Sequence, residues 1–321
     1  MQHRARAIAV LACAALGLAA GGAVADYPER PVRFIVPFVP GGPSDLLSRL
    51  LGQKLGESWG QTVVVDNRGS GDGIVGYELG AKAAPDGHTL LLASSSGLTI
   101  NPSMHRDLPY NPVRDYLPVS QLSSGAYFMV VHPAVPAKSL QEFVALAKTK
   151  PGQLNFATTA TSILLGMELL NHMAGIKTVA VGYKGTGQAL NAILSGEVQT
   201  FFLNPLVALP HIKAGRLRAL AVTGGKRNPS LPDLPPIADS YPGYEQFVWH
   251  CVMLPAKTPV PIVEKLSSEI MRIFRQPEIQ QRLNSVGLDA VGSTPEELAA
   301  LIRKETASYA ALVRRIGLQP Q

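Results

Sequence analysis

The sequence predicts an α/β fold with a mostly parallel sheet, and two features lead to this prediction. Short apolar runs of strand type alternate with segments whose leucines and isoleucines recur at helical spacing. Such alternation favours parallel strands joined by right-handed crossovers. The composition agrees, because 46% of the 321 residues are hydrophobic and only 6% are aromatic, as in a compact aliphatic core.

The first 25 residues are predicted to be a secretory signal peptide. Arg4 and Arg6 precede an apolar stretch over 7–20, and Ala23-Val24-Ala25 has the form of a cleavage site. The stretch is too short for a permanent membrane anchor, and no later stretch is long and apolar enough to replace it. We therefore expect cleavage after Ala25 and a mature protein in the periplasm.

The mature composition excludes several classes of protein. Removing Arg4 and Arg6 lowers the formal net charge from +6 to +4, and the remaining basic residues are spread along the chain. A nucleic-acid partner would need a clustered basic stripe, so we expect none. Cys251 is the one cysteine after the predicted leader, which leaves no intramolecular disulfide.

The stretch 32–45 predicts a strand, a tight turn and a helix N-terminus. An apolar run that reaches Phe38 stops at Gly41 and Gly42, and a leucine-rich helical pattern follows Ser44 and Asp45. Such a junction directs backbone N–H groups and the positive end of a helix dipole at one spot, which suits an anion. The alternative is a plain βα connection in which Asp45 is a favourable first-turn carboxylate.

The pattern repeats over the next elements. A strand over 62–65, a glycine-rich loop over 66–73, a helix over 74–84 and a strand over 89–93 follow in order. Ligands of such sheets bind beyond the carboxyl ends of strands, which makes Ser95 a candidate binding residue. The segment 71–76 matches G-x-G-x-x-G, but the next strand ends in serines rather than an acidic residue, and export argues against a nicotinamide cofactor. We predict no cofactor.

The second half of the chain contains a similar unit. Strands are predicted over 127–131 and 154–157, and a helix over 139–148 has Ser139 as its N-cap. The loop 158–162 then enters a helix over 163–173, so that Thr161 and Ser162 are either ligand-binding residues or simple helix caps. Further strands are predicted over 178–181, 198–203, 217–222 and 247–254, and further helices over 188–194, 209–214, 262–275, 277–286 and 295–316.

No catalytic motif occurs in the sequence. A G-x-S-x-G elbow, an H-E-x-x-H pair, a Walker loop and a C-x-x-C pair are all missing. The histidines after residue 25 have no ligand spacing, and we predict them to be surface or strand residues: His88, His105, His132, His172, His211 and His250. We therefore predict no metal site and no enzymatic activity.

Taken together, these motifs resemble a known family. The chain is similar to the Bug solute receptors, the periplasmic substrate-binding components of tripartite tricarboxylate transporters, over nearly the whole range 27–317. The segments that carry the resemblance are 40–45 (PGGPSD), 84–87 (APDG), 108–110 (LPY), 183–185 (YKG), 209–223 (LPHIKAGRLRALAVT), 231–235 (LPDLP), 242–244 (PGY) and 292–297 (GSTPEE).

The resemblance implies a two-lobed periplasmic binding protein of type II, with a small organic acid held between the lobes. Lobe one would comprise 26–122 and most of 247–321, and lobe two would comprise 123–246. The turn after the first strand would grip a ligand carboxylate, with Asp45 organising the turn. The opposing lobe would contribute Thr161, Ser162, Lys184 and Asn204. The implied partners are integral membrane permease subunits, and we expect a monomer.

Three departures from the family pattern bear on the ligand. The loop 158–162 is about two residues short, Leu164 stands near a position that often holds histidine, and Leu203 replaces a commonly acidic residue beside Asn204. An ammonium group would lose its counter-charge at Leu203, so we expect a carboxylate without an amino group. Two alternatives stay open: a ligand-sensing partner of a membrane two-component kinase, and a secreted enzyme that uses the same cleft.

Overall fold

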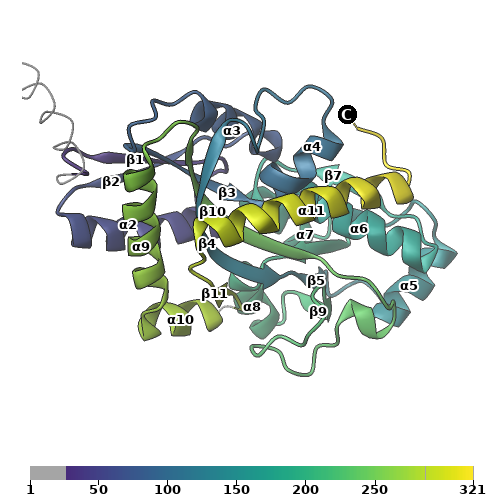
Figure 1. Cartoon of the computed structure of the whole chain (residues 1–321). Helices are drawn as coiled ribbons and strands as arrows, with labels where there is room; N and C mark the ends of the chain where they lie inside the picture. The colour runs from purple at the N-terminus through teal and green to yellow at the C-terminus, as the bar shows by residue number, and fades with distance from the viewer. Residues whose placement is uncertain (1–26, 286, 321) are drawn as a thin grey trace, which may run out of the picture.

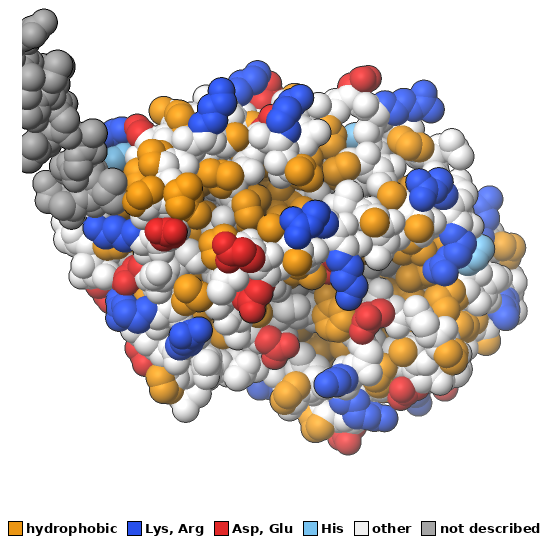
Figure 2. Space-filling model, in the orientation of Figure 1, with side chains coloured by type: hydrophobic (Ala, Val, Ile, Leu, Met, Phe, Trp, Pro, Cys, Tyr) orange, Lys and Arg blue, Asp and Glu red, His pale blue; other side chains and the backbone are white. Residues whose placement is uncertain are grey.

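The computed structural model describes residues 27–285 and 287–320, so the predicted signal peptide and its cleavage site lie outside the described residues. The chain forms two lobes, each built on its own β-sheet with helices packed around it (Figure 1). No helix within these ranges is long and apolar enough to cross a membrane. On the face shown in Figure 2, acidic and basic side chains are interspersed.

The first lobe contains a sheet of strand order β11-β4-β10-β3-β1-β2. Its strands are β1 (Val32–Val36), β2 (Val63–Asn67), β3 (Thr89–Ser94), β4 (Tyr116–Ala126), β10 (Phe247–Pro255) and β11 (Asp289–Ala290). The helices of this part of the chain are α2 (Pro43–Trp59), the 3-10 turn η2 (Gly71–Gly73), α3 (Ile74–Ala81), the π-type turn η3 (Ser96–Ile100), α4 (Asn101–Met104), α9 (Val260–Phe274), α10 (Pro277–Asn284) and α11 (Pro295–Arg315).

The second lobe contains a sheet of strand order β7-β6-β8-β5-β9. Its strands are β5 (Phe128–Val131), β6 (Asn155–Thr158), β7 (Val179–Gly182), β8 (Thr200–Leu203) and β9 (Arg218–Val222). Its helices are α5 (Leu140–Thr149), α6 (Thr161–Ala174), α7 (Thr186–Leu194), α8 (Pro205–Lys213) and the 3-10 turn η4 (Ile237–Asp239).

Both sheets are mixed, although a mostly parallel arrangement was expected. Parallel pairing joins β1 to β2 and β3, and it joins β6 to β7 and β8. Antiparallel pairing places β10 between β3 and β4, and it places β5 between β8 and β9. The difference follows from the path of the chain, because the strands that enter or re-enter a sheet at the crossings run against their neighbours.

The chain crosses between the sheets twice. The first crossing passes through Tyr127, between the end of β4 and the start of β5, and the second leads from β9 through the segment 223–246, which contains η4, to β10. The predicted boundary after Leu122 falls inside β4, which stays in the first sheet until Ala126. The strand arrangement thus supports two crossings, with the first a few residues later than expected.

Most predicted elements form within a few residues of their expected bounds, and Ser139 accepts the predicted capping hydrogen bond from the Glu142 N–H. The segments that were not predicted are β4, the helical stretch formed by η3 and α4, the short strand β11, and the 3-10 turns η2 and η4. Helix α8 also begins at Pro205 rather than near Leu209, because Asn204 caps it and Pro205 occupies its first position.

The C-terminal helix α11 packs on both lobes (Figure 1). Its first half buries Leu298 and Ile302 in the core of the first lobe. Its second half buries Val313 in a cluster that joins Ile100 and Met104 of the first lobe to Leu165 of α6 in the second lobe. One rigid element therefore spans the junction between the lobes.

Candidate functional site

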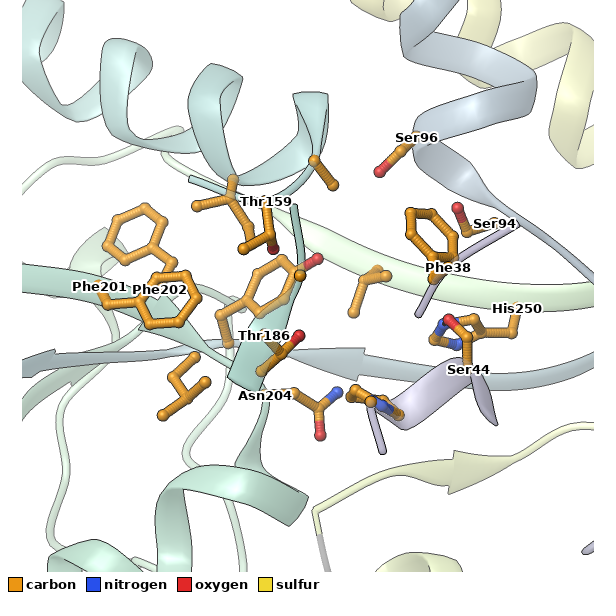
Figure 3. Close-up of a pocket in the computed structure, with 18 of the residues that line it drawn as sticks. Phe38, Ser44, Ser94, Ser96, Thr159, Thr186, Phe201, Phe202, Asn204 and His250 are labelled. Carbon is orange, nitrogen blue, oxygen red and sulfur yellow. The ribbon is translucent and has the colours of Figure 1, made fainter. Parts of the chain in front are cut away.

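A cavity of about 70 Å³ lies between the two sheets, at the carboxyl ends of β1 and β3 on one side and of β6 and β8 on the other (Figure 3). Its volume is several times the ~10–15 Å³ that one water molecule needs. The residues around it are Phe38, Val39, Gly42, Pro43, Ser44, Ser94, Ser96, Tyr127, Thr159, Ala160, Ile163, Gly185, Thr186, Phe201, Phe202, Leu203, Asn204, Val248 and His250.

The predicted turn after β1 forms one wall of the cavity. Gly41 has a φ of +84°, a left-handed conformation that favours glycine, and its N–H donates to Asp45 Oδ2 over 3.0 Å. Burial of the Asp45 carboxyl opposes ionisation, but hydrogen bonds from Arg49, Gly41 and Asn67 outweigh it and lower the pKa of Asp45. Asp45 does not line the cavity, and its contact with the Gly41 N–H bridges the turn.

Four helices begin at the cavity, one from the first lobe and three from the second. Their N-cap residues are Gly42 for α2, Ala160 for α6, Gly185 for α7 and Asn204 for α8, and each of these residues lines the cavity. The N–H groups of a first helical turn have no partner within the helix, and the helix dipole places partial positive charge there. Partial positive charge therefore faces the cavity from both sides. Helix α8 adds its dipole and the Asn204 side chain but no free N–H group, because Pro205 has none and the N–H groups of Leu206 and Val207 donate to Asn204.

The side-chain amide of Asn204 is oriented by its role as a cap. Its Oδ1 accepts a hydrogen bond of 3.0 Å from the Leu206 N–H, which leaves Nδ2 as the group directed to the cavity (Figure 3). Asn204 is 4% exposed, and its Nδ2 has no hydrogen-bond partner within the described chain. A buried donor without a partner costs free energy, so this nitrogen is suited to a ligand acceptor.

His250 of β10 lies on the first-lobe side of the cavity and contacts two serines. Its Nε2 is 3.0 Å from Ser44 Oγ, and its Nδ1 is 3.4 Å from Ser123 Oγ. Burial lowers the pKa of His250 to about 4, so the imidazole is neutral at pH 7. No Asp, Glu, Lys or Arg side chain belongs to the residues that line the cavity.

Hydrogen bonds also join the lobes beside the cavity. Ser96 Oγ donates to Ser162 Oγ over 2.8 Å, and Ser162 Oγ lies 3.0 Å from the Tyr127 hydroxyl. Thr161 Oγ1 donates to Asn101 Oδ1 over 2.7 Å. The two sides of the cavity are thus in direct contact in this structure.

The structure brings some predicted site residues together and places others elsewhere. Phe38, Gly42, Ser44 and Asn204 line the cavity, and Gly41 lies within the turn. The others do not line it: Asp45 supports the turn, Ser95 is buried behind the wall, Thr161 and Ser162 join the lobes, and the Lys184 side chain is exposed.

Several lining residues were not among the sequence candidates. Tyr127 lies in the first crossing, and Val248 and His250 lie in β10, the strand that follows the second crossing. Their places in the cavity wall depend on how the two lobes meet. His250 was predicted to be a surface or strand residue rather than a ligand or base, and it lies in β10 and lines the cavity. Thr159 and Thr186 had a usable signal, because each lies in the loop between a predicted strand and the predicted helix that follows it.

Two α/β lobes with a small donor-lined cavity between their strand ends define a solute-binding receptor. The chain belongs to the tripartite tricarboxylate transporter receptor family, because the family described as "Tripartite tricarboxylate transporter family receptor" matches residues 47–318. Among relatives, BugT of Bordetella pertussis is 35% identical over 310 residues, which cover 95% of this chain and 94% of BugT.

Solved structures agree with this assignment. Rpa4515 of R. palustris, solved with adipate, has a TM-score of 0.89 at 30% identity and covers 92% of this chain and 100% of its own. The periplasmic binding protein BugD has a TM-score of 0.86 at 30% identity, with coverage of 92% and 100%. MatC of Rhodopseudomonas palustris, with bound malate, has a TM-score of 0.84 at 28% identity, with coverage of 89% and 100%. The family and these neighbours are periplasmic solute-binding receptors, and the two-lobed fold that the sequence predicted is confirmed.

Proposed function

We propose that this protein is a periplasmic receptor that captures a small carboxylate without an amino group and delivers it to a tripartite tricarboxylate transporter permease. The observation that carries the proposal is the convergence of four helix N-termini, from both lobes, on one cavity without charged side chains. Such an arrangement stabilises negative charge through N–H groups and dipoles. Donors on both sides favour an acid with a carboxylate at each end, as in the adipate and malate bound by the relatives.

The lining also explains the expected exclusion of amino acids. Leu203 is 1% exposed and lines the cavity, where it offers no charge to an ammonium group. Leaving an ammonium buried without a partner costs several kcal/mol, which removes useful affinity. We therefore expect malate, succinate and adipate to compete successfully against aspartate and glutamate.

We further propose that the protein is a monomer and catalyses no reaction. Among the described residues that line the cavity, Ser44 and His250 make the contact that most resembles a nucleophile and base. A base whose pKa is about 4 is too weak to deprotonate a serine hydroxyl at neutral pH, and its second partner, Ser123, is an uncharged hydroxyl.

A thermal-shift screen followed by titration calorimetry tests the binding proposal. The mature protein is titrated with adipate, malate and succinate, and aspartate and glutamate serve as matched acids that carry an ammonium group. A ligand at 100 times its Kd should stabilise the protein by about 2.7 kcal/mol. Binding of none of the three acids, or tighter binding of the amino acids, would contradict the proposal.

Separate measurements test export, assembly and delivery. Mass spectrometry of periplasmic protein should find Asp26 at the N-terminus, and light scattering of that protein should give a single-chain mass. Loss of the gene should abolish uptake of the bound acid. Retained uptake together with a lost transcriptional response to the acid would favour the sensor alternative.

A further inference from the structure

His250 lies within hydrogen-bond distance of the Ser44 hydroxyl in the cavity wall. It belongs to β10, the strand at the centre of the first-lobe sheet, and its neighbours across the sheet are Ser94 in β3 and Ser123 in β4. It is 4% exposed, and it points toward Ser44 at the start of α2 (Figure 3). Ser44 in turn lines the cavity, two residues beyond Gly42 of the predicted glycine turn.

The three side chains form a continuous hydrogen-bonded row. Ser123 Oγ is 3.4 Å from Nδ1 of His250, and Ser44 Oγ is 3.0 Å from Nε2. A neutral imidazole carries one N–H donor and one acceptor nitrogen. The row can therefore run in two directions, and the direction decides what Ser44 presents to the cavity.

In one direction, Ser44 donates its proton to Nε2 and presents only lone pairs to the cavity. In the other, the Nε2–H donates to Ser44 Oγ, the hydroxyl proton of Ser44 points into the cavity, and Ser123 donates to Nδ1. Four helix N-termini favour an anion in this cavity. An anionic carboxylate is repelled by the lone pairs of the first arrangement and is bound by the proton of the second.

We propose that His250 is a positioning residue, which holds the hydroxyl of Ser44 as a hydrogen-bond donor to the ligand carboxylate. This inference rests on the proposed function, because it requires an anionic ligand in the cavity. It assigns His250 a role in affinity without contact to the carboxylate. Ser123 completes the row by supplying a proton to Nδ1.

A double-mutant cycle measured by titration calorimetry tests the proposal. The probe is whichever of adipate, malate and succinate binds the unmodified protein most tightly. Ser44→Ala should weaken binding about tenfold or more, since it removes a hydrogen bond to a charged group. His250→Phe should weaken it by a similar factor, and the double variant should be no weaker than Ser44→Ala alone.

Two further measurements separate positioning from simple packing. His250→Gln places an amide N–H near the position of Nε2 and should recover part of the affinity that His250→Phe loses. Nitrogen NMR of the unmodified protein should show His250 as the Nε2–H tautomer when the acid is bound, with the signal identified by its absence in His250→Phe. The tautomer is read from the unmodified protein with the acid bound, so this measurement does not require any variant to bind ligand; His250→Gln provides a second spectrum for identifying the signal if His250→Phe folds poorly.

The outcomes distinguish this inference from the proposed function. Multiplicative losses in the double variant, or an Nδ1–H tautomer in the bound state, would overturn the role of His250 and leave the receptor function intact. Failure of all three acids to bind the unmodified protein would contradict the proposed function, and the inference with it.

Discussion

Replacement of Gly185 by alanine should weaken ligand binding without unfolding the protein. Gly185 is the N-cap of α7 in the second lobe, and its φ of −179° is an extended conformation that alanine adopts freely. A Cβ at this position would lie 2.2 Å from Cγ2 of Val39, which belongs to the turn of the first lobe. The clash therefore acts across the cavity, between the lobes.

The size of the effect follows from this distance. Ordinary contact between carbon atoms is about 3.5–4.0 Å, so the two walls must separate or Val39 must change its rotamer. Overpacking of this kind costs about 1–3 kcal/mol. If the lobes part when no ligand is bound, only the closed, ligand-bound form meets this cost, and the affinity should fall about 5- to 150-fold.

Titration calorimetry with a confirmed acid measures the effect, and urea denaturation without ligand measures the stability. Alanine is a poorer N-cap than glycine, so the free energy of unfolding should fall by no more than about 1 kcal/mol. Gly187→Ala is the matched control, because it lies two residues further along α7 and its Cβ would meet no atom within 4 Å.

A second substitution tests whether contact between residue 185 and Val39 limits closure of the lobes. Val39→Ala removes the methyl group that the new Cβ meets, so it should restore much of the affinity in the Gly185→Ala background. If Gly185→Ala binds the acid as tightly as the unmodified protein, or if Val39→Ala restores nothing, contact between these two residues does not limit closure.

Three other predictions follow from the cavity. Gly42→Val adds branches beside Thr186 Oγ1, which would lie 3.7 Å from the new Cβ, so calorimetry should show at least tenfold weaker binding while the circular dichroism spectrum is retained. Leu203→Asp should lower the free energy of unfolding and shift competition binding from dicarboxylates toward aspartate, and an unchanged preference would show that Leu203 does not set selectivity. Acidification should destabilise the protein through His250, because the unfolded histidine takes up a proton near pH 6.5 while burial holds its native pKa at about 4. As the pH is lowered from about 6.5 to about 4, the free energy of unfolding should decrease by up to about 3 kcal/mol more in the unmodified protein than in His250→Phe. Urea denaturation at each pH measures this difference.

The local fold was predictable wherever the sequence carried an uninterrupted signal. The apolar run of β1 and Pro43 at the first position of α2 both form as expected. Strand β4 escaped prediction because its sequence, YLPVSQLSSGA, mixes a proline and serines with its apolar residues. Two of its serines, Ser120 and Ser123, are buried, and both have partners elsewhere in the fold: Ser120 donates to the backbone carbonyl of Ser293, and Ser123 contacts His250.

The site was predictable only in part, for a similar reason. The turn at Gly42 and the cap at Asn204 are local features, and the sequence marks both. The contribution of His250 depends on strand pairing between residues more than 120 positions apart, which no local pattern encodes. Thr161 was a reasonable candidate, but its hydroxyl donates a hydrogen bond to Asn101 of the opposite lobe.

The placement of α11 on both lobes has a thermodynamic consequence. From Ile302 to Val313 the helix spans about 16 Å, at 1.5 Å per residue, and it is anchored by apolar contacts at both ends. A helix of fixed length that is anchored at both ends limits the opening of the lobes to a rotation. A larger opening requires the cluster of Val313 and Leu165 to separate, which exposes its apolar surface to water. Exposure of apolar surface raises the heat capacity, and its burial lowers it. Closure around a ligand would then have a more negative heat-capacity change than the burial of a small, polar acid can account for.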